Sequence, residues 1–484
     1  MINYAEINRL AKERGKRVVD IVALAVGNDP FYAECAGRRV SAEWFAEQYE
    51  REGFATGTHI RRIHYRLISR EGQTDWRGNP YQNTNACWQA LLCAARDARF
   101  LGTVPLEDFD DRRNPTAVAT GVDLPDDPEL NPTGADAGGL FLSQNLVLPR
   151  LQLNAADRPA QPYHVEIWCE KSTMRDILDD VGRQYGVTRV YSLGEISLVA
   201  CVKLILDRVD RNGDRPTRIL YLSDFDPAGR SIPVAAARKV EWLIRAHDLD
   251  IDLQLIPILL DHDQCVNYEL PRTPLKADEG RADEWTLRFG EGGTELDALE
   301  ALHPGELRRI VTEALDRYHD HDLQGSWDEL LNERRSAIEL IADEIAGEYA
   351  SALEPHRAEC RRLAWEANHL REEVRMVYAK MLADINERTD DDILAPLFEF
   401  RSEREIVEHQ DPLFDSARDY LEQINRYKLF QGRDEAWAVR QRAKRALHAK
   451  KKRAEKKGNA ACAAESAVAR DSSMPGSRGD EAAP

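Results

Sequence analysis

The stretch that decides the fold runs from residue 164 to residue 260, where short apolar runs alternate with amphipathic ones. Four of the apolar runs have the length of buried strands: HVEIWCE (164–170), VTRVYSL (187–193), RILYLS (218–223) and IDLQLIPILL (251–260). Three stretches with helical periodicity separate them: TMRDILDDVGRQYG (173–186), SLVACVKLILDRVDR (197–211) and SIPVAAARKVEWLIRAH (231–247). Strands that alternate with helices form right-handed crossovers, so we expect an α/β fold with a parallel sheet.

Acidic residues follow two of these predicted strands. Glu170 ends the first strand, and Asp224 and Asp226 lie in the segment DFDPAG (224–229), directly after the third. Residues two apart in an extended segment point to the same side, and ligands of parallel sheets bind at the carboxyl ends of the strands. Three converging carboxylates repel each other unless a cation lies between them. Oxygen ligands without His or Cys favour Mg²⁺, with Mn²⁺ as an alternative.

A second interpretation of the DFDPAG segment is purely structural. Asp is common ahead of a helix, where its carboxylate accepts hydrogen bonds from the first backbone N–H groups. Pro227 suits the first turn of the helix that follows. In that case Asp224 and Asp226 would only cap the helix.

The acidic pattern resembles a known family. Glu170 after the first strand and DxDPxG after the third resemble the Toprim domain, the Mg²⁺-binding fold of topoisomerases, primases and certain nucleases. The DPxG ending resembles the A subunit of topoisomerase VI and the related meiotic double-strand-break transesterases. That family also has a Gly-Tyr-Pro-Asp-like turn after the second strand, whereas this chain reads GEIS (194–197). The role of that turn therefore does not carry over, although Glu195 is a candidate for a further acid.

The resemblance implies a winged-helix DNA-binding domain with a nucleophilic Tyr upstream of the sheet. The segment HIRRIHYRL (59–67) resembles the family's Arg-Asp-Ile-Tyr-Tyr segment, which puts Arg61 at the family's Arg, Arg62 at its Asp and Tyr65 at its catalytic Tyr. Helical geometry agrees with an exposed position for this Tyr. Ile60, Ile63 and Leu67 form one apolar stripe, and Tyr65 lies about 150° away from it.

The same helix is strongly basic. Arg61, Arg62, Arg66 and Arg70 fall within residues 59–70, which contain no acid. We expect these arginines to bind DNA phosphates, and the alternative is an ordinary solvated helix face. Further candidates for phosphate contacts are Arg96, Arg99 and the basic segment 440–457, which has ten Lys or Arg and one Glu. Five more polar residues are candidates for supplementing the acidic site or for plain ion pairing: Lys276, Asp278, Arg281, Glu295 and Asp297.

The chemistry that the resemblance implies is a transesterification. Tyr65 would attack a DNA phosphate to give a 5′-phosphotyrosyl link, with Arg61 and Glu170 as the other catalytic residues and the metal held by Glu170, Asp224 and Asp226. In this family the Tyr and the Toprim domain come from different protomers, which implies a homodimer. Strand passage would need a separate ATPase subunit, because the chain has no GxxxxGK[ST] loop.

Two other functions are compatible with these residues. The first is a Toprim nuclease that cleaves DNA with metal-activated water, in a mobile-element or defence context. The second is a DNA-binding protein without catalytic activity, in which the acids are structural.

Length and composition predict several units in this chain of 484 residues, of which 43% are hydrophobic and 31% charged. We expect five segments: a winged-helix-like domain at 1–102, a linker at 103–160, a Toprim domain with an extension at 161–323, a helical region at 324–457 and a disordered tail at 458–484. Heptad-like spacing predicts a helical hairpin in the fourth, with Leu363, Ala367, Leu370, Val374, Val377 and Met381 on its seam.

The net charge of −19 argues at first against a nucleic-acid partner, but the positive charges are concentrated in a few segments. No window reaches the length of uncharged apolar sequence that a membrane helix needs. The eight cysteines are scattered and form no CxxC pair, which favours reduced thiols. We expect a cytoplasmic protein without membrane association, located at the nucleoid if it binds DNA.

Overall fold

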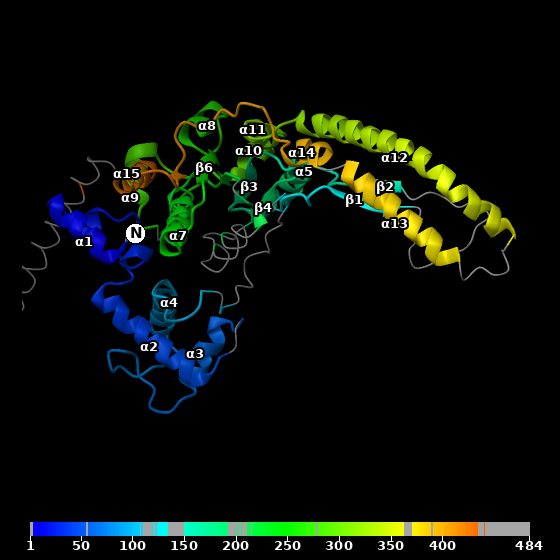
Figure 1. The fold of residues 1–484 in the computed structure, drawn as a ribbon. Helices are drawn as coiled ribbons and strands as arrows, with labels where there is room; N and C mark the ends of the chain where they lie inside the picture. Colours follow the sequence, from blue (N-terminus) through cyan, green and yellow to red (C-terminus); the bar gives the residue numbers. More distant parts are fainter. Residues whose placement is uncertain are drawn as a thin grey trace, which may run out of the picture.

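The computed structural model describes residues 3–54, 57–106, 108–109, 120–121, 123–133, 150–191, 201, 205, 211–213, 215–276, 279–362, 370–388, 391–433 and 440. A five-stranded sheet with the order β4-β3-β5-β6-β7 lies in the body of the fold (Figure 1). Four strands run parallel: β3 (His164–Cys169), β4 (Thr188–Tyr191), β5 (Thr217–Leu222) and β6 (Leu253–Leu259). These are the four strands that the apolar runs predicted, so the α/β class and the parallel arrangement are confirmed.

The fifth strand was not predicted. β7 (Phe414–Asp415) pairs antiparallel with β6, and it comes from a part of the chain more than 150 residues further on. It leads into α15 (Tyr420–Phe430), which packs on the sheet. The end of the helical region therefore returns to the sheet and completes its core.

Helices cover both faces of the sheet. Successive residues of a strand point to opposite faces, and here both faces carry buried apolar side chains. Ile219 and Tyr221 belong to one apolar core, whereas Leu220 and Leu222 belong to the other. The first core also contains α1 (Tyr4–Glu13), α7 (Ile232–Ala246) and α15. The second contains α5 (Arg175–Tyr185), α10 (Leu296–Leu302) and α11 (Glu306–Leu315). The result is a three-layer arrangement.

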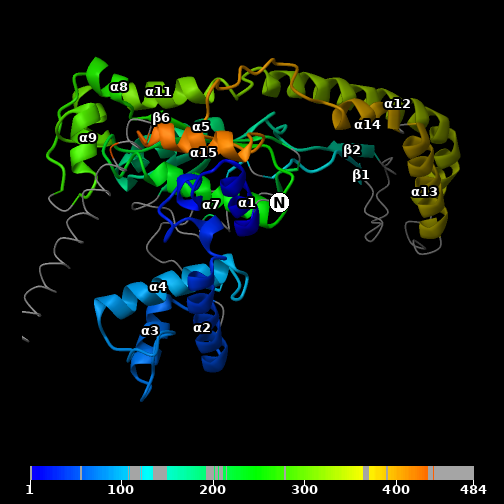
Figure 2. The same ribbon diagram turned by 90° about the vertical axis from the view of Figure 1, so that its left-hand side faces the viewer.

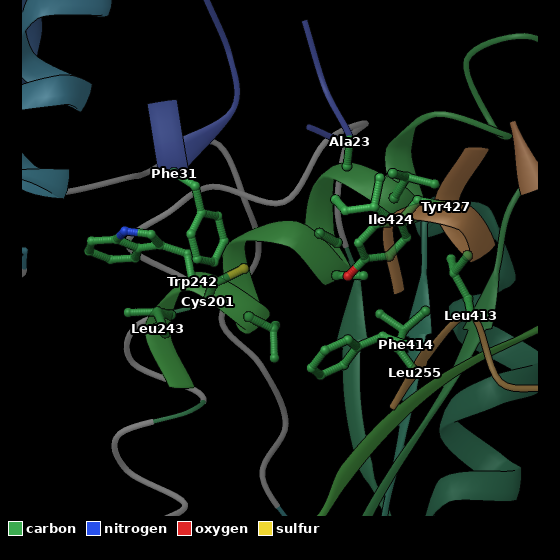
Figure 3. Packing of buried hydrophobic residues seen from close by; sticks show 14 of the residues in the cluster. Ala23, Phe31, Cys201, Trp242, Leu243, Leu255, Leu413, Phe414, Ile424 and Tyr427 are labelled. Atoms are coloured by element: carbon green, nitrogen blue, oxygen red, sulfur yellow. The ribbon is translucent and has the colours of Figure 1, made fainter. Parts of the chain in front are cut away.

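The first core joins segments that are far apart in the sequence. Phe31 from the N-terminal segment, Trp242 from α7, Leu255 from β6 and Tyr427 from α15 all belong to it (Figure 3). Two short 3₁₀ turns, η1 (Val18–Asp20) and η2 (Pro30–Tyr32), carry the N-terminal segment across this face. Apolar residues between Ile7 and Ala33 therefore belong to the core of the sheet, although this segment also accepts hydrogen bonds from Arg38 of α2.

The predicted helix boundaries agree with local signals. α5 ends before Gly186, which has φ of 65°, a left-handed conformation that Gly adopts without the usual steric cost. α7 begins with Pro233 in its first turn, where the missing N–H would have no helical partner. Of the helix predicted at 197–211, the structure describes only three helical residues, Cys201, Ile205 and Arg211.

Three helices form a lobe beside the sheet, separated from it in both views (Figure 1, Figure 2). They are α2 (Ala36–Glu52), α3 (Ile60–Ile68) and α4 (Asn85–Phe100), and they share a core of their own. A bridge between Thr74 and Pro80 closes a turn between α3 and α4. The end of α4 joins the lobe to the body, since Phe100 packs on Trp242 at a ring distance of 4.8 Å. Assignment of this lobe as a winged helix stays a prediction.

A long arm extends from the body (Figure 2). α12 (Leu323–Arg362) has 40 residues, about 60 Å, and packs against α13 (Leu370–Arg388) and α14 (Asp391–Phe398). On the predicted seam Val374 and Met381 are buried, which confirms the helical hairpin there, whereas Leu363 and Ala367 lie outside the described residues. The hairpin of β1 (Glu129–Thr133) and β2 (Arg150–Asn154) packs on the arm through Leu153.

The remaining short elements are η3 (Ser172–Met174), α8 (His262–Asn267) and α9 (Ala282–Phe289). The domain boundaries at 102, 160, 323 and 457 stay predictions. The tail at 458–484 and the basic segment, Arg440 excepted, lie outside the described residues. Throughout the part of the chain that is described, no helix is both long and apolar enough to cross a membrane.

Candidate active site

The sheet brings the three predicted acids together at the carboxyl ends of neighbouring strands. β3 and β5 pair with Cys169 opposite Leu222, so Glu170 lies one residue beyond β3 and Asp224 two residues beyond the adjacent β5. The Glu170 amide donates to the Leu222 carbonyl at 3.0 Å, which extends the pairing to the first acid. Burial, together with the negative charges of Asp224 and Asp226, raises the pKa of Glu170 to about 7. The three carboxyl groups therefore lie near enough to one another to interact electrostatically.

The turn that carries the two aspartates is closely packed. Phe225 is buried and pairs through its backbone with Thr294, at N···O distances of 2.8 and 2.9 Å. A Cβ atom at Gly229 would lie 1.9 Å from the Asp224 carbonyl oxygen, so the chain can close here only with Gly. The Asp226 carboxylate accepts from the Gly229 amide at 2.6 Å. This bond closes the turn before α7, whose N-cap is Ser231 without a side-chain hydrogen bond, so the predicted capping of the helix by these aspartates was wrong.

Segment 294–297 adds more charge to the cluster. Because Thr294 pairs with Phe225, the following residues pass the acids, and the Leu296 amide donates to Asp224 Oδ1 at 2.8 Å. Glu295 and Asp297 each lie near the ammonium of Lys171, whose Nζ is 2.7 Å from Glu295 Oε2, 3.5 Å from Asp297 Oδ2 and 3.0 Å from Asp224 Oδ2. From the sequence, Glu295 and Asp297 were candidates only for supplementing the acidic site or for ion pairing. Lys171 was not predicted, because its position beside Glu170 is the single sequence feature that points to it.

The donor set fits a hard divalent cation. All five acids offer oxygen atoms, which is the ligand type that Mg²⁺ and Mn²⁺ prefer. One oxygen of Glu170, Oε2, is fully buried and has no hydrogen-bond partner, a costly arrangement unless a cation satisfies it. Within the described ranges, no group of three or more His, Cys, Asp or Glu side chains is arranged around a common metal position. Lys171 contacts three of the five acids, and Asp224 has one oxygen against its ammonium and the other against the Leu296 amide.

Tyr65 faces outward from α3, as helical geometry predicted. Its side chain is 57% exposed, while Ile63 and Leu67 are fully buried on the opposite side. The helix is capped by His59, whose Nδ1 accepts from the Arg61 amide at 3.2 Å. The Arg61 guanidinium lies 5.9 Å from the Trp88 ring centroid, and the side chain remains exposed beside Tyr65. Arg62 is also exposed.

The basic face of α3 is smaller than the sequence predicted. Arg66 Nε lies 2.7 Å and Arg70 Nη2 2.5 Å from the two oxygens of Glu52, a residue at the end of α2. The hydrogen bond from Arg66 holds the pKa of Glu52 below its usual range. Residues 59–70 contain no acid, but Glu52 of α2 supplies one; binding of DNA phosphates by Arg66 and Arg70 stays a prediction. Arg61 and Arg62 have no carboxylate partner of this kind among the described contacts.

Other predicted contacts are engaged within the protein or fall outside the described residues. Arg96 donates to Asn28 Oδ1 at 3.1 Å and to the Gly27 carbonyl, so it anchors α4 to the N-terminal segment. Arg99 lies over the Phe109 ring at 4.9 Å. Arg281 Nε pairs with Glu279 at 2.6 Å. Glu195 and Asp278 are not described.

Tyr65 and the acids lie in different parts of one protomer. α3 lies in the lobe, while β3 and β5 lie in the body, and both views separate them (Figure 1, Figure 2). No protein-family model matches the chain, and no curated protein is similar to it in sequence.

Proposed function

We propose that this chain is a Mg²⁺-dependent DNA-breaking protein resembling the topoisomerase VI A subunit, with a Toprim-like acidic site and a catalytic Tyr65. One observation carries the proposal: Glu170, Asp224 and Asp226 interact electrostatically at the carboxyl edge of a parallel sheet, and one buried Glu170 oxygen has no hydrogen-bond partner. Carboxylates that repel each other destabilise a fold, and a bound cation removes this cost by neutralising part of their charge. Such groups are therefore typical of functional sites.

Each residue has a defined part in the proposed reaction. Glu170, Asp224 and Asp226 would hold the ion, which offsets negative charge on the phosphate and on the leaving oxygen. Tyr65 loses its phenolic proton and its oxygen bonds to phosphorus, while the bond to the 3′ oxygen breaks and that oxygen takes up a proton. Arg61, one turn before Tyr65, would bind the same phosphate through paired N–H donors. Arg62 is free to contact an adjacent phosphate.

The proposed active enzyme is a homodimer. Tyr65 and the acids lie apart within a protomer, so one protomer would present Tyr65 to the acidic site of a second. The exposed position of Tyr65 supports this arrangement, because a second protomer can reach the phenol from solvent. Strand passage would require a separate ATPase subunit.

Removal of the Tyr65 hydroxyl tests the proposal. Purified wild-type protein and Tyr65→Phe are incubated with supercoiled DNA and Mg²⁺ or Mn²⁺, and the products are denatured to reveal protein covalently attached to 5′ ends. Wild-type protein should cleave and form the adduct, and Tyr65→Phe should do neither. Tyr4→Phe on α1, the same loss of a hydroxyl, should behave as wild type.

A nuclease that uses water is the second candidate, and the separation of Tyr65 from the acids favours it. Glu170, with a pKa of about 7, is able to accept a proton from water near neutral pH. Cleavage that survives in Tyr65→Phe, with no covalent adduct in either protein, would support this function. If Asp224→Ala and Asp226→Ala leave every DNA-dependent activity intact, the protein is a non-catalytic DNA-binding protein instead.

A further inference from the structure

Lys171 is the one ammonium in direct contact with the acidic cluster in the described part of the chain. Its Nζ bridges Asp224 and Glu295 at 3.0 and 2.7 Å and lies 3.5 Å from Asp297. A compact cation at this position offsets part of the repulsion among the carboxylates. It also pairs with Asp224 Oδ2, whereas the backbone of segment 294–297 donates to the other oxygen, Oδ1.

The Lys171 side chain is placed to move. The residue lies between β3 and η3 in an extended conformation, and its side chain is 22% exposed, so the flexible stem reaches both the acids and solvent. The acids are held more firmly. Asp224 accepts from the Leu296 amide and Asp226 from the Gly229 amide, and the Gly229 turn leaves no space for a Cβ. When a second cation enters, the lysine is therefore the partner that yields.

We propose that Lys171 is the resident counter-ion of the acidic cluster, and that it leaves the carboxylates for a DNA phosphate when a divalent cation binds. This inference rests on the proposed function. The ammonium and the divalent cation compete for Asp224, so metal binding without DNA is weakened. With DNA present, the displaced ammonium gains a phosphate partner, and metal and DNA strengthen each other's binding.

Removal of the lysine charge should separate these two effects. Calorimetric titration of Mn²⁺ into the metal-stripped full-length protein measures the affinity, first alone and then with a short DNA duplex. Lys171→Met should bind Mn²⁺ at least about tenfold more tightly than wild type without DNA, because a unit charge within 4 Å shifts cation affinity by that order. In wild type, DNA should tighten Mn²⁺ binding, and in Lys171→Met it should do so much less.

Controls separate failure of this inference from failure of the proposed function. Lys12→Met makes the same change on the exposed face of α1 and should leave both affinities at the wild-type values. Asp224→Ala should abolish Mn²⁺ binding. If it does so while Lys171→Met binds Mn²⁺ as wild type does or more weakly, the metal site stands and the role of Lys171 is wrong.

Two further outcomes are decisive. If neither wild type nor Lys171→Met binds Mn²⁺, both the metal site and the counter-ion role are overturned. If Lys171→Met does not fold, as judged by circular dichroism, Lys171→Gln keeps hydrogen-bond donors at the position and should show the same gain in Mn²⁺ affinity. A Lys171→Gln protein that is folded and lacks the gain refutes the inference.

Discussion

Neutralising Glu170 should stabilise the metal-free protein at alkaline pH. The folded-state pKa of this carboxyl is raised from 4.5 to about 7 by burial and by the charges of Asp224 and Asp226. A raised folded pKa means that stability is fully present below about pH 4.5 and is lost as the pH rises through about 7. At about 1.4 kcal/mol per pKa unit, the loss at pH 8 amounts to about 3 kcal/mol. Glu170→Gln keeps the shape and removes the charge, so it should recover most of this free energy.

Urea denaturation in the presence of a chelator measures the effect. At pH 8, the free energy of unfolding of Glu170→Gln should exceed that of wild type by about 2–3 kcal/mol. At pH 5, the free energies of unfolding of the two proteins should be nearly equal. Mg²⁺ at about a hundred times its Kd should stabilise wild type at pH 8 by about 2.7 kcal/mol and Glu170→Gln by much less. Glu43→Gln, an exposed change on α2, should show no pH-dependent gain.

Equal stability of wild type and Glu170→Gln at pH 8 would refute the reasoning. It would mean that the carboxylate is solvated in the folded protein and that Asp224 and Asp226 do not act on it. A stabilisation that is the same at pH 5 and pH 8 would also count against it, because a charge effect must follow the titration of the group.

Three further changes test other parts of the structure. Gly229→Ala should lower the free energy of unfolding by about 1–3 kcal/mol and weaken Mn²⁺ binding, because its Cβ would lie 1.9 Å from the Asp224 carbonyl oxygen; urea denaturation and calorimetry check this. Glu52→Gln should raise affinity for duplex DNA about fivefold at low salt, since it frees the two arginines that it pairs with; fluorescence anisotropy measures the change, and its disappearance at high salt is expected. Arg238→Met should cost about 3–5 kcal/mol by urea denaturation, because it leaves Asp29, which is fully buried, without its 3.1 Å ion pair; a cost below about 1 kcal/mol would show that the backbone N–H donors to Asp29 suffice.

The central sheet was predictable because its strands are buried on both faces. Runs such as RILYLS and HVEIWCE are apolar throughout and alternate with amphipathic helices, a pattern that local sequence carries without help from distant residues. The convergence of Glu170 with Asp224 followed from the same pattern, since adjacent parallel strands end at one edge. β7 and α15 could not be predicted in this way. A two-residue strand and one amphipathic helix do not encode which core they join, and Tyr427 reaches the sheet only after the long arm has turned back.

The electrostatic partners were the other feature that the sequence did not reveal. Arg66 and Arg70 share Glu52, which lies 14 residues before the first of them on a different helix. Lys171 meets Glu295 across 124 residues. Ion pairs of this kind depend on how elements pack, because a charged side chain is compatible with almost any exposed position in the sequence. The charge pattern along the chain therefore predicts more unpaired arginines on α3 than the structure has, and fewer carboxylates near Asp224.

The charges of the chain constrain how DNA could bind. The net charge is −19, and the acidic edge of the sheet combines five carboxylates with one ammonium, so without added cations this edge repels a phosphodiester. Under the proposed function, attraction has to begin elsewhere, and the exposed Arg61 and Arg62 on α3 are the groups we propose for it. On our proposal, contact with the acids would become favourable only when a divalent cation neutralises them and Lys171 turns toward the phosphate. On this argument DNA binding to the lobe should depend on salt but not on Mg²⁺, whereas DNA engagement of the acidic edge should require both.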